Sequence, residues 1–386
     1  MTASRASPFD PWDQQATLIG LLCVAAAAFL DLPVILGVLA DLRGLSPDRL
    51  GQIAAAETFG TAVTAAISPW LLVRLRARTL LGVGMALLVV FNVTSCVTTA
   101  YVAFIVVRLG ASIGTGIAMP AAVACLGNCS RPERAFSWAV SAQVVTSAVE
   151  LFAFGYAARQ YGVVGIYGSL ALAAVIAGVA SLRLGDLPRP AAGASGGGAA
   201  LSARSKASLA AVMLLFACIG VYWAFIERVG LLAHLSAEEV GGWLAASNAP
   251  ALLASLGAPW IAQRLGERRM LLLGLGLTVL VPLGLLLPLQ PAVYLANLAL
   301  FVLLWNSLMV VQMAVLGRWD AQGLAVGLTP AAQGLGLALA PLLAGEVAES
   351  RGYPAAMALA SGFALLALLA TWHAFRPEAE PAPNPA

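Results

Sequence analysis

The sequence predicts an all-α integral membrane protein in which twelve transmembrane helices form two parallel six-helix repeats around a central cavity. The first observation is compositional: hydrophobic residues make up 61% of the 386 residues, charged residues only 10%, and the mean hydropathy is +0.90. Because about a quarter of the residues of a soluble domain are charged, this chain cannot cover a water-facing surface. The other two observations are an internal repeat and a series of long apolar runs.

The repeat is clearest around a Pro-Trp pair that is followed by arginines. Pro69, Trp70, Arg74 and Arg78 each recur 190 positions later, and the same offset pairs Gln143 with Gln333 without a gap. Matches of these residue types at one register are far more informative than matches of alanine or leucine. The chain is therefore expected to consist of two copies of one unit.

Apolar runs of about 20 residues are long enough to cross a bilayer, and the chain contains twelve of them, six in each repeat. They lie at 17–40, 48–73, 79–99, 101–127, 133–157, 162–184, 207–233, 238–263, 269–288, 291–317, 322–345 and 352–375. The expected domains are an N-terminal tail (1–16), a first six-helix bundle (17–184), a cytoplasmic linker (185–206), a second bundle (207–375) and a disordered tail (376–386).

The distribution of basic residues predicts the orientation. With the N-terminus in the cytoplasm, fifteen basic residues fall on the cytoplasmic side, four fall outside and two fall within the spans. This bias places both termini in the cytoplasm of a bacterial-type inner membrane, with the first span retained rather than cleaved. Two repeats of the same orientation are typical of transporters whose halves rock about a central site.

Two motifs resemble those of the major facilitator superfamily. The turn after the eighth span, from Gln263 to Arg269, is similar to the family's Gly-x-x-x-Asp-Arg-x-Gly-Arg-Arg signature, with Gln263 in place of Asp. The turn after the second span keeps the arginines but lacks both the Asp and the Gly. The resemblance implies a cytoplasmic gate, and the alternative is that the arginines only anchor the orientation. The gate residues so implied are Arg74, Arg78, Gln263, Arg264, Gly266 and Arg268.

The fourth span carries the second motif, which begins at Arg108 and continues through Ser112, Gly114 and Gly116. It is similar to the family's Arg-x-x-x-Gly-x-Gly-x-Gly element, in which the arginine is linked to proton transfer. Small residues allow helices to approach closely, and an embedded arginine needs a polar cavity or an acidic partner.

Four carboxylates within the spans are candidate partners or coupling groups. Asp31 and Arg108 are expected at similar depth in the outer half of the membrane, where they could pair and exchange that bridge for a proton. The alternative is a static pair that fixes helix packing. Glu150 shares a predicted helix face with Gln143. Glu57 is interpreted either as part of the site or as a solvated group near the headgroups.

In the second repeat, polar and aromatic side chains lie in the middle of predicted spans. Together with Gln143 and Glu227 they are candidates for a substrate wall, and the alternative is that the aromatic residues are packed core. The candidates in this repeat are Tyr222, Trp223, Trp305, Asn306 and Gln312. Met309 and Met313, four residues apart, leave copper(I) transport open as an alternative.

These observations favour a proton-coupled secondary transporter of small organic molecules over an enzyme or a channel. The sequence has only two histidines, His234 and His373, neither in a metal-binding spacing, and no P-loop, so no cofactor, metal or nucleic acid is expected. Partners are the bilayer, protons and a small-molecule substrate, with the chain acting as a monomer. Export is slightly favoured, and uptake of an aromatic or carboxylate metabolite is the alternative.

Overall fold

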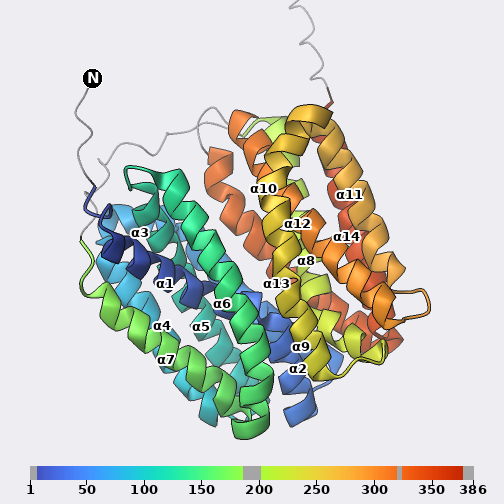
Figure 1. Cartoon of the computed structure of the whole chain (residues 1–386), viewed down its shortest axis with the longest axis horizontal. Coiled ribbons are helices and arrows are strands. Elements are labelled where there is room, and N and C mark those ends of the chain that lie inside the picture. Colours follow the sequence, from blue (N-terminus) through green and yellow to red (C-terminus); the bar gives the residue numbers. More distant parts are fainter. Residues whose placement is uncertain (1–6, 186–200, 320–323, 377–386) are drawn as a thin grey trace, which may run out of the picture.

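The computed structural model describes residues 7–185, 201–319 and 324–376, which fold into fourteen α-helices (Figure 1). The first half contains α1 (Trp12–Leu30), α2 (Leu32–Arg43), α3 (Pro47–Arg74), α4 (Ala77–Val97), α5 (Tyr101–Gly127), α6 (Pro132–Tyr161) and α7 (Val163–Ser181). The second contains α8 (Ala203–Leu232), α9 (Ala237–Ala246), α10 (Asn248–Leu265), α11 (Glu267–Gly284), α12 (Pro291–Trp319), α13 (Leu324–Arg351) and α14 (Tyr353–Ala374).

These helices confirm the predicted fold. Ten of the twelve predicted spans are single helices, whereas the first is divided at Asp31 into α1 and α2 and the eighth at Ser247 into α9 and α10. Nine helices of the described part are by themselves long and apolar enough to cross a membrane. Because α1 begins at Trp12, the first span starts earlier than predicted. Residues 1–6, 186–200 and 377–386, which carry most of the predicted tails and linker, lie outside the described ranges.

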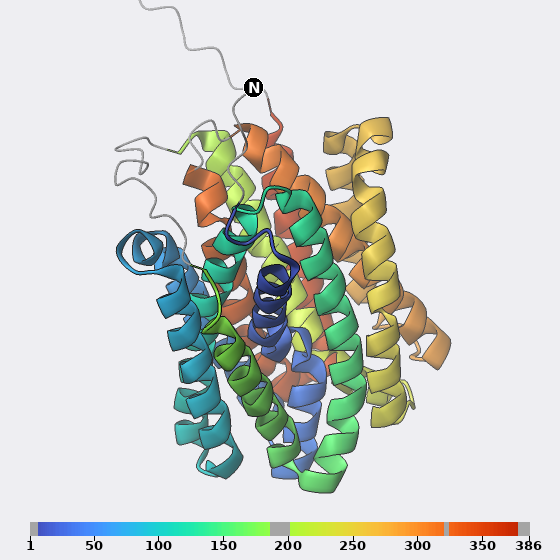
Figure 2. The same ribbon diagram turned by 60° about the vertical axis from the view of Figure 1, so that its left-hand side comes forward.

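Each half begins beside its own end, at one end of the molecule (Figures 1 and 2). Near the start of α1, Gln14 Nε2 donates to the carbonyl of Arg183 (3.2 Å) and Gln14 Oε1 accepts from Gly185 N (2.9 Å). The equivalent residue 190 positions later, Arg204, donates from Nη2 to the carbonyl of Arg376 (3.4 Å). The repeat therefore extends to the contacts that close each bundle.

Two equivalent glycine contacts join the halves. Gly51 on α3 lies against the carbonyl of Pro341 on α13, so that a Cβ at position 51 would collide with it. The equivalent Gly241 on α9 lies against the carbonyl of Leu151 on α6, where a Cβ would be 3.3 Å away. The two partner residues, Leu151 and Pro341, are themselves 190 positions apart, as expected if the halves are related by an axis along the membrane normal. The first contact is the tighter of the two.

The break in the first span has a local cause. Pro33, in the first turn of α2, has no N–H to offer the carbonyl four residues earlier, that of Phe29. The indole Nε1 of Trp223, from the other half, donates to the carbonyls of Phe29 (3.2 Å) and Leu30 (3.1 Å). A side chain of the second half thus satisfies the interrupted backbone of the first, as a membrane interior requires.

The glycines of the Arg108 motif have the predicted packing role. A Cβ at Gly114 on α5 would lie 2.8 Å from the carbonyl of Gly84 on α4, and one at Gly116 would collide with the Thr64 hydroxyl on α3. Small side chains therefore let α3, α4 and α5 approach closely. This close packing holds Arg108 between three helices.

Candidate transport site

Arg108 forms a buried ion pair with Glu57. Its Nε lies 2.5 Å from Glu57 Oε1 and its Nη2 lies 2.8 Å from Glu57 Oε2 on α3, and both residues are almost completely buried. Nη1 donates to Asn92 Oδ1 (2.8 Å) and Ser95 Oγ (3.0 Å) on α4. The guanidinium also lies 4.5 Å from the ring centroid of Tyr167 on α7. The bidentate pair and its neighbours satisfy the embedded charge.

The predicted pairing of Arg108 with Asp31 is therefore wrong. Arg108 faces α3 and α4, whereas Asp31, at the break between α1 and α2, faces α6. Sequence position predicts a similar depth for the two groups, but it does not give the rotation of each helix about its own axis. Glu57 is not a solvated group near the headgroups either, because only 5% of its surface is exposed.

Asp31 is fully buried and only half satisfied. Its Oδ1 accepts a hydrogen bond from Ser147 Oγ on α6 (2.8 Å), whereas its Oδ2 has no hydrogen-bond partner among the residues that the structure describes. In the described part of the chain no lysine or arginine lies within 4.0 Å of it. Glu150 lies one helical turn after Ser147 on the same face of α6 and is half-buried, which places a second carboxyl group beside Asp31. A carboxyl group that carries a proton can donate a hydrogen bond to a neighbouring carboxylate.

Gln143 and Glu150 lie on one face of α6, as the sequence predicts. Gln143 Nε2 donates weakly to the carbonyl of Leu22 on α1 (3.4 Å), and Ser147 lies between the two along the same face. The positions 143, 147 and 150 follow the spacing that places side chains on one side of a helix. This face of α6 therefore runs along the broken first span.

The aromatic side chains of the second half meet that break from the other side. The ring centroid of Trp305 on α12 lies 5.6 Å from that of Trp223 and 6.2 Å from that of Phe29. Trp305 is half-buried, and its buried Nε1 has no hydrogen-bond partner. Asn306 is also half-buried and donates to the carbonyl of Val302 in its own helix (2.9 Å).

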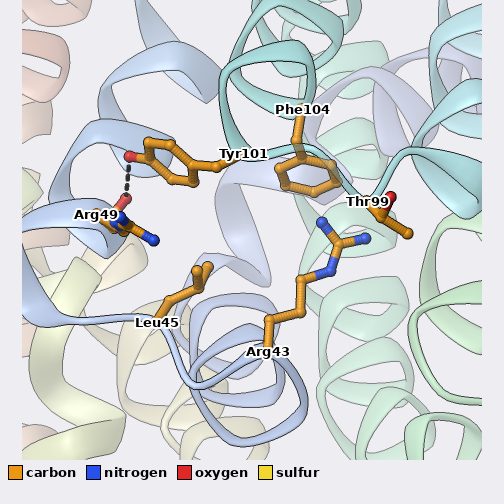
Figure 3. Close-up of a pocket in the computed structure, with 6 residues that line it drawn as sticks. All are labelled: Arg43, Leu45, Arg49, Thr99, Tyr101 and Phe104. Atoms are coloured by element: carbon orange, nitrogen blue, oxygen red, sulfur yellow. Dashed lines mark hydrogen bonds between the residues drawn. The ribbon is translucent and has the colours of Figure 1, made fainter.

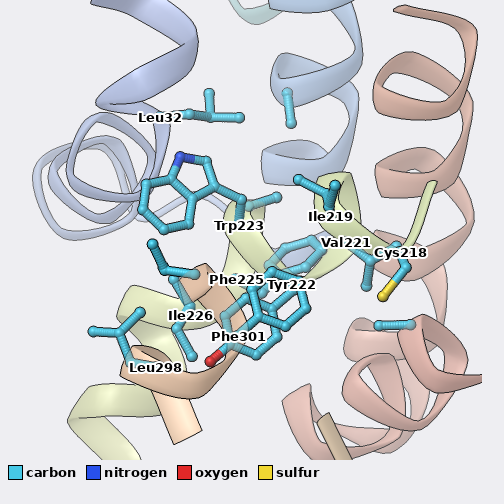
Figure 4. Packing of buried hydrophobic residues seen from close by; sticks show 14 of the residues in the cluster. Leu32, Cys218, Ile219, Val221, Tyr222, Trp223, Phe225, Ile226, Leu298 and Phe301 are labelled. Carbon is cyan, nitrogen blue, oxygen red and sulfur yellow. The ribbon is translucent and has the colours of Figure 1, made fainter. Parts of the chain in front are cut away.

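Tyr222 and Gln312 lie away from this group. Figure 4 shows Trp223 directed toward the helix that carries Leu32, whereas Tyr222 lies beside Phe301. The Tyr222 hydroxyl donates to Asn297 Oδ1 (3.0 Å) and its ring stacks on Phe301, with 3.6 Å between centroids. Tyr222 is therefore packed core, the alternative that the sequence left open.

Gln312 on α12 is also buried, and neither its Oε1 nor its Nε2 has a hydrogen-bond partner. It lines a small cavity within the second half, together with Ser208 and Thr371. Met309 and Met313 pack against the same apolar core.

Glu227 belongs to a contact between the halves at the end of the molecule that is predicted to be the outer one. Its carboxylate bonds the neighbouring Arg228, whose Nη1 lies 2.7 Å from Asp41 Oδ1 on α2. Gly37, the repeat equivalent of Glu227, lies directly against its carboxylate, and a Cβ at position 37 would be 2.5 Å from it. The residues of this contact bridge α2 and α8 rather than line a wall near Asp31.

The arginines of the predicted cytoplasmic gate make matching contacts in the two halves. The guanidinium carbon of Arg74 lies 4.1 Å from the ring centroid of Trp70, and that of Arg264 lies 3.8 Å from that of Trp260. Arg268 lies over Trp372 on α14 (5.8 Å). The second copy turns at Gly266, which has φ +80°, a conformation that favours glycine. Within the described residues, no contact of Arg78 or Gln263 tests a role in gating, so the cytoplasmic gate stays a prediction.

Sequence reasoning missed the neutral partners of the embedded charges. Asn92 and Ser95 hold Arg108, and Ser147 holds Asp31. Asn92 and Ser95 are spaced i, i+3 within an otherwise apolar run, and this polar face on the third span was a usable signal. Phe29 is an ordinary apolar residue by sequence, and only the break in the helix brings it against Trp305.

Comparison with known proteins identifies the family. The family model of the Major Facilitator Superfamily matches residues 17–317 and 234–386, so the chain belongs to this superfamily. No curated protein matches the sequence. The chain is a multi-pass integral membrane protein with the fold of a secondary transporter.

Solved structures share this fold over nearly their whole length. The nucleoside transporter NupG has a TM-score of 0.76 at 12% identity, covering 94% of this chain and 99% of that one. The partially occluded inward-open xylose transporter XylE from E. coli has a TM-score of 0.74 at 15% identity, covering 97% and 100%. A D-xylose-proton symporter has a TM-score of 0.70 at 16% identity, covering 94% and 96%.

Proposed function

We propose that the protein is a proton-coupled secondary transporter that moves a small organic molecule by alternating access, with export of amphipathic cations favoured. The observation that carries the proposal is the buried, half-satisfied Asp31 with Glu150 beside it. Arg108 is held by Glu57 and does not neutralise this pair. The carboxyl pair is the group in the described chain that is left open to a proton or a cation.

Electrostatics explain why a proton would be bound there. An isolated ionised carboxylate in an apolar interior is strongly disfavoured, and a buried carboxyl takes up a proton instead. With one proton, Asp31 and Glu150 can share a hydrogen bond, as other adjacent carboxyl groups do. A cationic substrate would compete with that proton for the same oxygens, and such competition is the basis of exchange.

The location of Asp31 gives the proton a way to respond to the motion of the halves. Asp31 lies at the break in the first span, and the neighbouring backbone carbonyls accept from Trp223 of the other half. Rocking of one half against the other would move this donor and change the surroundings of Asp31. Proton binding and the direction in which the site opens would then depend on each other.

The half-buried side chains of Phe29, Trp305 and Asn306 supply a surface for the substrate beside the break. Aromatic rings bind apolar bodies and attract cations through their faces. All three guanidinium nitrogens of Arg108 already donate to Glu57, Asn92 or Ser95, which disfavours a substrate carboxylate as a ligand of this arginine. This weakens the alternative of organic-anion uptake.

The same proposal includes the setting of the protein. The excess of basic residues on one side supports cytoplasmic termini and a bacterial inner membrane. Each half begins and ends at one face, which fits a cytoplasmic linker between residues 185 and 206. Asp31, Trp223 and Trp305 come together from the two halves of one chain, which supports a monomer.

Proton release on substrate binding tests the proposal. The purified protein in weakly buffered detergent solution is mixed with cationic, neutral and carboxylate compounds, while tryptophan fluorescence reports binding. Wild type should release protons with at least one class of cation. Asp31→Asn should bind compounds without release, because an amide has no proton to give up.

Asp41→Asn is the matched control, since it removes a carboxylate from the same broken span at its exposed outer end. It should release protons as wild type does. Equal release from Asp31→Asn and wild type would overturn the assignment of Asp31. Proton uptake together with binding of a carboxylate or neutral compound would instead support the uptake alternative.

A further inference from the structure

A cavity of about 320 Å³ lies at the outer end of the first half, and neither Asp31 nor Glu150 lines it. Figure 3 shows its walls, which come from the end of α2, the α2–α3 loop, the start of α3 and the start of α5. The lining residues are Arg43, Leu45, Arg49, Thr99, Tyr101 and Phe104. Two arginines and no carboxylate line it.

Arg43 is held in place from two directions. It is the last residue of α2, and Gly44 directly after it has φ +58° and turns the chain toward α3. Its Nη2 donates to the carbonyl of Thr98 (3.0 Å), and its guanidinium carbon lies 4.3 Å from the ring centroid of Phe104. These contacts fix the planar guanidinium and leave further N–H groups free to bind a ligand.

Arg49 forms the opposite wall. Its guanidinium carbon lies 4.8 Å from the ring centroid of Tyr101, and the Tyr101 hydroxyl donates to Gln52 Oε1 (2.7 Å). The nearest acidic residue in sequence, Asp48, accepts from Ser46 instead. In the described part of the chain, no carboxylate lies within 4.0 Å of Arg43 or Arg49.

We propose that this cavity binds an oxyanion, a phosphate or carboxylate group attached to an organic body. Guanidinium groups bind the oxygens of these anions in a bidentate manner, and here two of them face one open volume without a competing acid. The Thr99 hydroxyl adds a donor at the rim, while Leu45 and Phe104 offer apolar surface to the body of the ligand. The site does not depend on the substrate or direction of transport.

The cavity is also connected to the buried ion pair. Phe104, under Arg43, packs edge-on against Tyr167, with 5.8 Å between ring centroids, and Tyr167 lies under Arg108. An anion bound to Arg43 would therefore be linked to the Arg108–Glu57 pair through the ring contacts of Phe104 and Tyr167. A ligand could come from the outer solution or from the phosphate of an outer-leaflet lipid, since the chemistry is the same.

Two measurements on the full-length protein distinguish these sources. In detergent, melting temperature is followed while inorganic phosphate or glycerol phosphate replaces chloride at constant ionic strength. In nanodiscs, retention of phosphatidylglycerol against phosphatidylcholine is counted by native mass spectrometry. A soluble oxyanion gives saturable stabilisation in the first measurement, and a lipid headgroup gives selective retention in the second. Either result supports the proposed oxyanion site.

The variants are Arg43→Gln and Arg49→Gln. Loss of a charge-assisted hydrogen bond should weaken binding about tenfold or more, and Arg43→Lys should lie between wild type and Arg43→Gln. Arg49→Gln keeps the test valid if loss of the Thr98 contact unfolds Arg43→Gln. Arg351→Gln, which removes a positive charge from the same face outside the cavity, should bind as wild type does. Binding in both measurements that is unchanged by the Arg43 and Arg49 variants, or absent from wild type, would overturn the proposal.

Discussion

The two halves share one repeat and one fold but not their buried charges. Four embedded ionisable residues of the first half have uncharged equivalents in the second, 190 positions later. The pairs are Asp31 and Val221, Glu57 and Ser247, Arg108 and Leu298, and Glu150 and Ala340. Because the second half packs with small or aliphatic residues at these positions, packing of the repeat does not require the charges.

The second half differs in a complementary way. At the level of the break it contributes Trp223 and Trp305, and α8 stays continuous where the first span is interrupted. The first half thus holds Asp31, Glu150 and the Arg108–Glu57 ion pair, and the second half supplies an indole hydrogen-bond donor and aromatic surface to the region of the break. This comparison supports a division of labour between coupling and substrate contact.

Arg108→Leu, which introduces the residue type of the equivalent Leu298, should have the largest effect on stability. It leaves Glu57 buried without a partner, which costs about 3–5 kcal/mol of stability. The double variant Glu57→Ser with Arg108→Leu reproduces both residues of the second half and should recover most of that loss. Thermal unfolding in detergent measures both, and a double variant no more stable than the single one would contradict the comparison.

The glycine contacts between halves give a second test. Gly51→Ala should destabilise the protein by about 1–3 kcal/mol, because its Cβ meets the backbone carbonyl of Pro341, which cannot move freely. A Cβ at Gly241 would lie 3.3 Å from the carbonyl of Leu151, which would have to move by only a few tenths of an ångström, so Gly241→Ala should cost clearly less stability than Gly51→Ala. Equal melting temperatures for the two variants would show that the two contacts are equally tight.

Trp223→Phe should have a smaller effect. It removes the indole donor to Phe29 and Leu30 while keeping an aromatic ring, and one such hydrogen bond contributes about 1 kcal/mol. Trp305→Phe is the control, because the Trp305 indole N–H has no partner. Melting temperature and hydrogen exchange of α1 and α2 should respond only to Trp223→Phe.

Replacement of Asp10, which precedes α1, should have the smallest effect on stability, and this effect should depend on pH. Hydrogen bonds from the hydroxyl and N–H of Ser130 lower the pKa of this carboxyl below its ordinary value of 3.8. A carboxyl whose folded pKa is lowered adds stability above its unfolded pKa and loses it as pH falls through the folded value. Asp10→Asn should therefore melt slightly earlier than wild type at pH 7, and this difference should shrink as pH falls from 3.8 through the lower pKa of the folded state.

The fold was predictable because its causes lie in local sequence. Apolar length and the offset of 190 predict the spans and the repeat that the structure contains, and the orientation indicated by the arginine bias stays a prediction. Both interrupted spans were predicted as continuous, because a single Asp31 or Ser247 lowers the mean hydropathy of a run of more than 20 residues too little to end it. The break at Asp31 depends on Pro33 and on a donor from the other half, which pattern alone does not reveal.

The site was predictable in its residues but not in its pairing. Their embedded charges singled out Asp31, Glu57, Arg108 and Glu150, and all four side chains are buried or half-buried in the structure. Which charges meet depends on the rotation of each helix, set by contacts such as Gly116 against α3. Tyr222 and Trp223 are adjacent in sequence, yet they point to different neighbours for the same reason.

The central claim is that Asp31 couples proton movement to transport. The most direct test uses proteoliposomes and the compound that gives the largest proton release. Substrate exchange without a pH gradient is compared with accumulation driven by one, in wild type and Asp31→Asn. The account predicts that Asp31→Asn keeps exchange but loses gradient-driven accumulation. Accumulation by Asp31→Asn at the wild-type rate would contradict it.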